Sequence, residues 1–192
     1  REKKMPLWGA TDSDESKPKN LTTAQKKQVF ANASGWVLEA GYALSGNDNT
    51  DADPEVLVAI GELSTSIGAA DITEVEMVTT TADKSEGFTI SVRVRYNEPV
   101  DVVTTGGTPT LAVTNDNSGT GSGRGPHSLS YASGTGTNEL IFSLAIAAAN
   151  AATNADDVLT VGAQSIALNS GTIKDASGTA SDASLVISSA PV

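Results

Sequence analysis

The sequence predicts an all-β protein whose C-terminal part is an antiparallel β-sandwich. Apolar side chains alternate strictly with Thr, Ser and Arg over residues 88–96, and the same period recurs over 140–146. This period of two is typical of strands that have one buried and one solvated face. From residue 73 onward, such segments are separated by clusters of Gly, Asn, Asp and Ser, which is the pattern of a sandwich rather than of helices packed on a sheet.

We expect eight strands in this part of the chain, and their apolar members should form one core. The predicted strands are 73–81, 87–96, 109–114, 127–132, 138–146, 158–167, 171–174 and 184–188. The predicted core residues are Phe88, Ile90, Val92, Val94, Leu111, Val113, Leu140, Phe142, Leu159 and Val161. The Ala- and Asn-rich stretch 145–155 is compatible with a helical turn or a loop.

We assign residues 73–192 to the sandwich, and two further segments precede it. Residues 27–72 read as a small β-unit, with two β-rich pieces around a turn in 28–39, a third at 55–61 and a loop between them. A helix over 22–30 is the main alternative, because Thr22-Thr23-Ala24-Gln25 resembles a helix start. Residues 1–26 lack periodicity and contain two prolines, so we expect an extended arm.

The arm differs in charge from the rest of the chain. Residues 1–30 carry a net charge of +3, whereas residues 31–192 carry −14. The arm is therefore either a solvated tail or a basic docking segment for an acidic neighbour. Trp8 would then be an anchor in a partner's pocket or would fold back on its own domain. The candidate docking residues are Leu7, Trp8, Lys17 and Lys19.

Composition excludes several kinds of chemistry. There is no cysteine, so a disulfide scaffold, a thiol nucleophile and a Cys-type zinc site are impossible. The single histidine, His127, lies in a Gly-rich stretch and reads as a loop residue, without the carboxylate and exposed nucleophile that a catalytic triad needs. Gly121–Gly125 lacks the Lys-Ser/Thr of a phosphate loop. We therefore expect no enzyme activity and no cofactor.

Two acidic features are candidate binding sites. The loop 47–55 is rich in Asp and Asn and could wrap a Ca²⁺ ion, but it lacks the sharp-turn Gly and closing Glu of a twelve-residue calcium loop, so a solvated turn is favoured. Glu74, Glu76, Glu86 and Glu98 read as residues of solvated strand faces. The acidic body argues against nucleic acid as a partner, and no apolar run is long enough to cross a bilayer.

Four motifs follow one another in order along the sandwich. They are a strand that ends in an aromatic, a polar pair and Pro-Val (87–100), a Pro-Thr-Leu strand (109–113), a Tyr-x-Ser-Gly-x-Gly-Thr turn before a Leu-x-Phe strand (131–142), and Gly-x-Ile-x-Asp followed by a glycine (171–178). In this order they resemble bacterial Ig-like modules, which occur in surface adhesins and in phage structural proteins. The resemblance implies an Ig-like fold and little about function.

The N-terminal part contains four short motifs, Pro6-Leu7-Trp8-Gly9, Lys17-Pro18-Lys19, Val29-Phe30-Ala31 and Gly35-Trp36. In this order they resemble the start of virion proteins of tailed phages that infect marine bacteria. Together the two resemblances imply a structural protein on the capsid surface of a virion, a decoration or cement protein. It would contact the major capsid protein or other virion subunits in multiple copies. The alternatives are a tail or neck protein, a bacterial surface adhesin and a carbohydrate-binding module.

Overall fold

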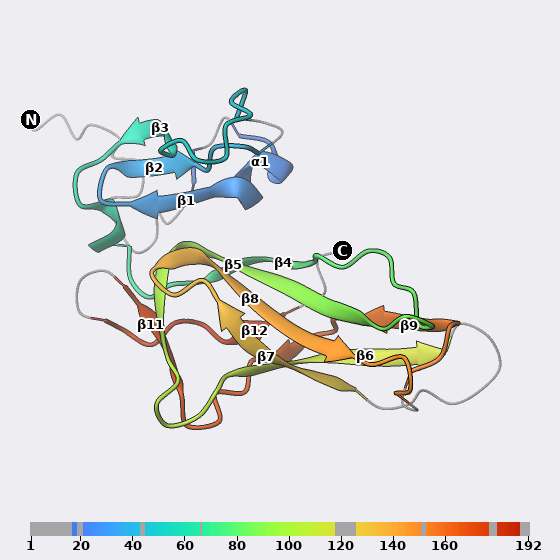
Figure 1. The fold of residues 1–192 in the computed structure, drawn as a ribbon. Coiled ribbons are helices and arrows are strands. Elements are labelled where there is room, and N and C mark those ends of the chain that lie inside the picture. Colours follow the sequence, from blue (N-terminus) through green and yellow to red (C-terminus); the bar gives the residue numbers. More distant parts are fainter. Residues whose placement is uncertain are drawn as a thin grey trace, which may run out of the picture.

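The computed structural model describes residues 17–18, 21–42, 45–65, 67–117, 126–150, 153–176 and 180–188. Its elements are almost entirely β-strands, arranged as a small N-terminal unit above a larger antiparallel sandwich (Figure 1). The predicted fold class is therefore confirmed. Each of the two units has its own cluster of buried apolar residues.

The N-terminal unit is a three-stranded antiparallel sheet preceded by one short helix. The order is β1-β2-β3, formed by β1 (Val29–Asn32), β2 (Gly35–Leu38) and β3 (Glu55–Ala59). A 3-10 turn (Leu63–Thr65) closes the unit. Its core is small but well buried, with Trp36 and Ala31 both 0% exposed. The other buried members are Val29, Leu38, Leu63 and Ile67.

The helix α1 (Thr23–Gln28) confirms part of the alternative that the sequence left open, with strand structure beginning at Val29. Thr22 and Gln25 form a reciprocal capping box, in which each side chain accepts a hydrogen bond from the other residue's backbone N–H. The N–H groups of a first helical turn have no partner within the helix, and hydrogen bonds from them to nearby side chains stabilise the start of the helix. The helix spans the boundary that we predicted between the arm and the β-unit at residues 26 and 27.

The sandwich is dominated by one antiparallel sheet in the order β11-β5-β8-β7-β6-β9, with β4 beside β5. Two short strands, β10 and β12, pair with each other. The bounds are β4 Ile72–Met77, β5 Phe88–Val103, β6 Thr110–Asn117, β7 His127–Ser133, β8 Thr137–Ile146, β9 Asp157–Thr160, β10 Gln164–Ser165, β11 Thr172–Asp175 and β12 Val186–Ile187.

The long strand β5 organises this sheet. It pairs with β8 along one edge, while its other edge pairs first with β4 and then with β11. The change of partner coincides with a break in register between Arg95 and Val100, where residues 94–98 are all buried. Such irregularities bend a strand and increase its twist. Here the break lets one strand contribute to both halves of the sandwich.

The predicted core is largely confirmed. Eight of the ten predicted residues are buried, while Phe88 and Leu159 are partly buried and pack against the same cluster. Phe142 is 0% exposed and meets Tyr131 edge-on, with ring centroids 6.1 Å apart. Five of the eight predicted strands agree with the observed bounds to within three residues, whereas the strand predicted at 73–81 ends after β4 does and the one predicted at 87–96 ends well before β5 does.

Several expectations differ from the structure. The predicted strand 158–167 is split into β9 and β10 by residues 161–163, where Gly162 weakens a continuous strand. Glu98 was expected on a solvated face but is 0% exposed, because it lies in the irregular part of β5 where alternation fails. His127 was expected in a loop but is a buried residue that begins β7. In the Ala-rich stretch, the described residues 147–150 and 153–155 contain no helix, which agrees with the loop, one of the two alternatives for this stretch.

Candidate functional site: the junction between the two units

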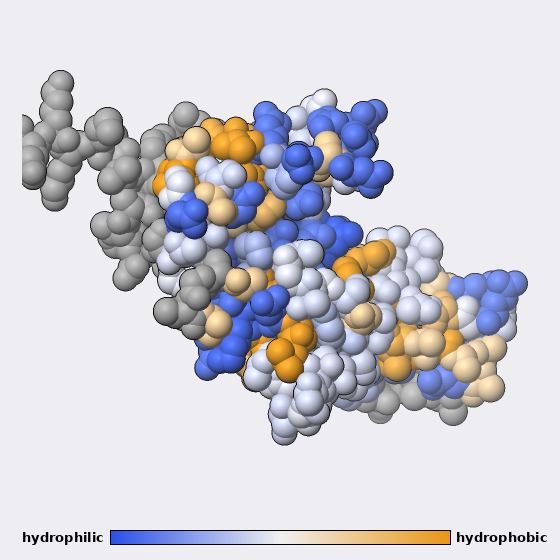
Figure 2. All heavy atoms as spheres, turned by 60° about the vertical axis from the view of Figure 1, so that its left-hand side comes forward, coloured by the Kyte–Doolittle hydropathy of each residue, from blue (hydrophilic) through white to orange (hydrophobic). Residues whose placement is uncertain are grey.

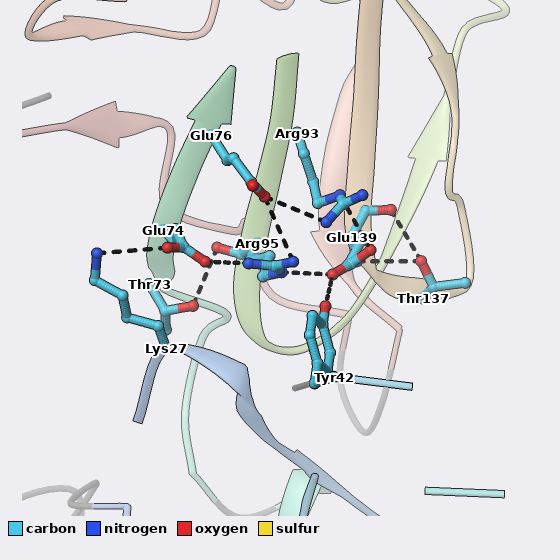
Figure 3. Close-up of polar contacts among 9 residues, drawn as sticks. All are labelled: Lys27, Tyr42, Thr73, Glu74, Glu76, Arg93, Arg95, Thr137 and Glu139. Atoms are coloured by element: carbon cyan, nitrogen blue, oxygen red, sulfur yellow. Dashed lines mark hydrogen bonds and ion pairs between the residues drawn. The ribbon is translucent and has the colours of Figure 1, made fainter. Parts of the chain in front are cut away.

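A cluster of charged side chains joins the N-terminal unit to the sandwich. The sandwich contributes Glu74 and Glu76 from β4, Arg93 and Arg95 from β5, and Glu139 from β8. These strands are neighbours in the order β4-β5-β8, so antiparallel pairing places Arg95 opposite both Glu74 and Glu139. The facing unit contributes Lys27 of α1 and Tyr42, which follows β2 (Figure 3).

Arg95 lies at the centre of this junction, and its side chain is only 6% exposed. Its Nε donates a 2.5 Å hydrogen bond to Glu139, its Nη1 donates to Glu74, and its Nη2 lies 3.6 Å from Glu76 (Figure 3). Burial alone lowers the pKa of Arg95, but the hydrogen bonds to Glu139 and Glu74 and the negative charge of Glu139 raise it overall. The guanidinium is therefore a permanent cation held by carboxylates on both neighbouring strands.

Tyr42 connects the N-terminal unit to this cation. Its hydroxyl donates a hydrogen bond to Glu139, and the Arg95 guanidinium carbon lies 4.7 Å from its ring centroid. This is the geometry of a cation–π contact. Burial, followed by the hydrogen bond to Glu139, raises the pKa of the Tyr42 hydroxyl. The phenol therefore stays protonated and keeps donating across the junction.

Further ion pairs surround this centre. Lys27 Nζ lies 3.4 Å from Glu74, and Arg93 lies 3.2 Å from Glu76 and 3.4 Å from Glu139. The chain that links the two units is also fixed here. The Asp71 N–H donates to the side chain of Asn97 over 2.7 Å, and the Asn97 N–H donates to the Asp71 carbonyl over 2.9 Å.

Of the four predicted docking residues, only Lys17 lies within the described part of the chain. Its ammonium donates a hydrogen bond to the Lys26 carbonyl of its own α1, and the adjacent Pro18 is buried. Burial lowers the pKa of Lys17 to about 8, although Glu74 partly opposes this. Leu7, Trp8 and Lys19 lie outside the described residues. Their role in docking, and that of Lys17 toward a partner, stay predictions.

An open cleft of about 450 Å³ lies between the two units. Figure 2 shows hydrophilic surface in the notch where the upper and lower parts of the molecule meet. The cleft is lined by Ala24, Lys27, Gln28, Gly41, Tyr42, Glu74, Glu76, Arg93 and Arg95. Most of these charges are paired with one another, so the junction is built to hold two units together rather than to bind an excess of charge.

Sequence reasoning missed most of this junction. The alternation over 88–96 correctly put Arg93 and Arg95 on the face opposite the core residues, but it suggested a solvated face. Arg93 and Arg95 stand two residues apart, so they share one face of the strand. Two cations on one face indicate a place where carboxylates of neighbouring strands can gather, and this signal could have revealed the junction. Nothing local to Tyr42 or Glu139 predicted their meeting, because they are separated by 97 residues.

The other candidate residues have structural roles. His127 Nε2 lies 3.1 Å from Asn115 Nδ2 and 3.0 Å from Thr153 Oγ1, which ties the start of β7 to the segment before β9. In the loop 47–55, the side-chain oxygens of Asn47 and Asn49 accept hydrogen bonds from the N–H groups of Asn49 and Asp51, as in an Asx turn. Within the described ranges, no three His, Cys, Asp or Glu side chains are grouped as metal ligands.

Comparisons with known proteins gave no relationship. The chain matches no family model, no curated protein and no solved structure. In the described part of the chain, no helix is long and apolar enough to span a bilayer.

Proposed function

We propose that this chain is a non-enzymatic structural protein of a phage particle, a capsid decoration protein. It docks through its N-terminal part on the major capsid protein and displays the Ig-like sandwich outward. One observation carries the proposal. The end of the arm is built into the junction, because Pro18 is buried and Lys17 is bonded to α1, while Arg95 and Tyr42 clamp both units. Because the arm is fixed to both units through the junction, binding of the arm to the particle would hold the whole molecule there.

The charge distribution supports the same arrangement. The net charge of −14 on residues 31–192 favours a solvated, outward position for the sandwich, whereas the +3 of residues 1–30 favours contact with an acidic surface. An extended arm buries a large area per residue, and its ordering entropy is offset only when a partner surface is present.

Loading onto purified particles tests the proposal. Chains lacking residues 1–16 keep Lys17 and the junction, so we expect them to fold as judged by circular dichroism but to lose incorporation. A second variant, Leu7→Ala with Trp8→Ala, should show the same loss. The control is Val103→Ala, which removes an exposed valine (51%) from the sandwich and should load normally.

Copy number distinguishes the positions in the particle. Quantitative mass spectrometry of intact virions should find this chain in capsid-like numbers, far above those of tail or neck subunits. A few copies per virion would place it in the tail or neck. Its absence from every purified particle fraction, or normal loading without residues 1–16, would overturn the proposal that the arm docks it on a capsid.

A further inference from the structure

We propose that the outer edge of β4 is a strand-binding site that accepts residues 7–12 of the arm of a second copy of this chain. This inference rests on the proposed function, because it assumes an assembly in which copies lie side by side. It assigns residues 7–12 of the arm to a neighbouring copy, so contact with the capsid falls to the other residues of the N-terminal part. The bound segment would add one strand to the sheet, next to β4.

The first observation is that this edge has no strand partner among the described residues, although residues 186–188 lie beside Ile72–Val75. β4 pairs with β5 through Ile72–Met77 and residues 92–96, which uses only one of its two edges. Within the described ranges, no backbone hydrogen bond reaches the other edge of Ile72–Met77. An unpaired edge presents a row of N–H and C=O groups that pairs readily with another extended chain. β4 also has no Lys or Pro, the residues that commonly block such an edge.

The second observation is that hollows line β4 and the segment that follows it. One of about 230 Å³ lies between Ile72–Val75 and the end of the chain around β12, where Val186 is 60% exposed. The other, of about 310 Å³, lies between residues 77–82 and β9. Its apolar lining includes Met77, Phe88 and Leu159. An added strand would therefore find space for its side chains at both ends of the edge.

The arm has the length and the side chains to fill this site. Sixteen residues precede Lys17, and an extended chain covers roughly 3.3 Å per residue, so the arm reaches about 50 Å. Pairing along β4 uses about 20 Å of this, which leaves the remainder to bridge two copies. Pro6 has no N–H and is tolerated just before a strand. Residues 7–12 contain no proline, so each has a backbone donor, and Trp8 is the large apolar side chain suited to the hollow lined by Phe88.

The bound arm comes from a second copy of this chain. In an array of copies, the local concentration of neighbouring arms is of the order of millimolar, so an arm can pair with the next molecule. Each molecule then gives one arm and receives another, a heterologous contact that closes into a ring or extends over a surface. Such an arrangement covers every β4 edge while leaving the sandwich facing outward.

Cross-linking tests this directly, because the chain has no native cysteine. One copy carries Trp8→Cys, and a second copy of different mass carries Thr80→Cys, at an exposed residue that lines the hollow beside β9. They are mixed at about millimolar concentration, the range expected for a packed array, and oxidised. We expect a mixed disulfide dimer, confirmed by peptide mass spectrometry. The control partner carries Val103→Cys, at a residue that is also exposed but is paired with β11, and the dimer should be lost.

Three results would overturn the inference. They are no mixed dimer, equal dimer with Val103→Cys, or a disulfide that forms only within one chain in the double variant Trp8→Cys, Thr80→Cys. Loading onto particles is measured in parallel with the unmodified chain. If loading onto particles requires residues 1–16 but no cross-link to Thr80→Cys forms, this inference is wrong while the proposed function still holds.

Discussion

At the scale of single residues, Arg95 illustrates how a buried charge specifies an arrangement. Removing an ion from water is costly, and a buried pair is stable only when the remaining donors and acceptors are satisfied. Arg95 meets this condition with carboxylates on both sides and an aromatic ring over its face. The guanidinium fork suits this role better than an ammonium, because it donates in several directions in one plane. Its contacts fix the N-terminal unit on one face of the sheet.

Replacing Arg95 should therefore be costly. Arg95→Met leaves Glu74 and Glu139 without their shared cation, and we expect a loss of about 3 kcal/mol in the free energy of unfolding, typical of a broken buried pair. Urea denaturation followed by circular dichroism measures it. Arg93→Met is the matched control, because that side chain is 27% exposed and more solvated pairs contribute about 1 kcal/mol or less. Equal losses for the two variants would contradict the central role of Arg95.

Lys17 should give the stability a dependence on pH. Its pKa is about 8 in the folded protein and 10.5 in ordinary surroundings. Below pH 8 it is charged in both states, so the cost of burying the charge is fully present. Between pH 8 and 10.5 only the folded state loses the proton, so the contribution of Lys17 to stability rises with pH.

Two substitutions isolate this effect. Lys17→Met cannot titrate, so the stability of this variant relative to the wild type should be greatest below pH 8 and should fall as pH approaches 10.5. Lys17→Arg stays charged throughout, and it should lose stability relative to the wild type over the same interval. Urea midpoints measured from pH 7 to 10.5 provide both differences. A difference for Lys17→Met that does not change with pH would show that this ammonium is solvated when the protein is folded.

At the scale of elements, regular strands were predictable and their interruptions were not. The alternation over 140–146 depends only on which face of β8 is buried, so the sequence alone identified Leu140 and Phe142 as core. Glu98 was misassigned because the register break in β5 suspends alternation, and a break depends on strands that lie far along the chain. Helix α1 depended on a capping box, a local signal that the sequence did contain.

The hairpin between β7 and β8 explains one of the sequence motifs physically. In the Tyr-x-Ser-Gly-x-Gly-Thr turn, the Thr135 N–H donates to the Tyr131 hydroxyl, and the Thr137 hydroxyl donates to the Gly134 carbonyl. Gly134 has φ of 112°, and a Cβ there would lie 1.9 Å from the Glu139 carbonyl oxygen. Only glycine fits a backbone that is both left-handed and this close to the next strand.

Gly134→Ala should therefore disrupt this hairpin. Backbone strain of this kind costs about 1–3 kcal/mol, and the overlap with backbone atoms of β8 adds to it. The matched control is Gly162→Ala, where an added methyl group meets no atom within 4 Å and a change of about 1 kcal/mol at most is expected. Thermal and urea unfolding compare the two. If Gly134→Ala were as stable as the control, the turn would have an alternative backbone conformation.

At the scale of the whole molecule, two apolar cores are joined by the polar junction and by the packing of β1 against β5. The N-terminal core is small, and a unit of this size buries too little apolar surface to be very stable alone. The sandwich supports it through the junction and through the hydrogen bonds between Asp71 and Asn97. Because polar contacts need defined geometry, the junction should make the two units unfold together.

This coupling can be measured with the two tryptophans of the chain. In a Trp8→Phe background, fluorescence reports only Trp36, which is 0% exposed in the N-terminal core, while far-UV circular dichroism is dominated by the strands of the sandwich. We expect both signals to change at the same urea concentration, as a two-state transition requires. Adding Arg95→Met should move the Trp36 transition to lower urea while the circular dichroism transition moves less, because the small unit then loses its support first. Separate transitions in the Trp8→Phe protein itself, or coincident ones after Arg95→Met, would show that the junction does not couple the two cores.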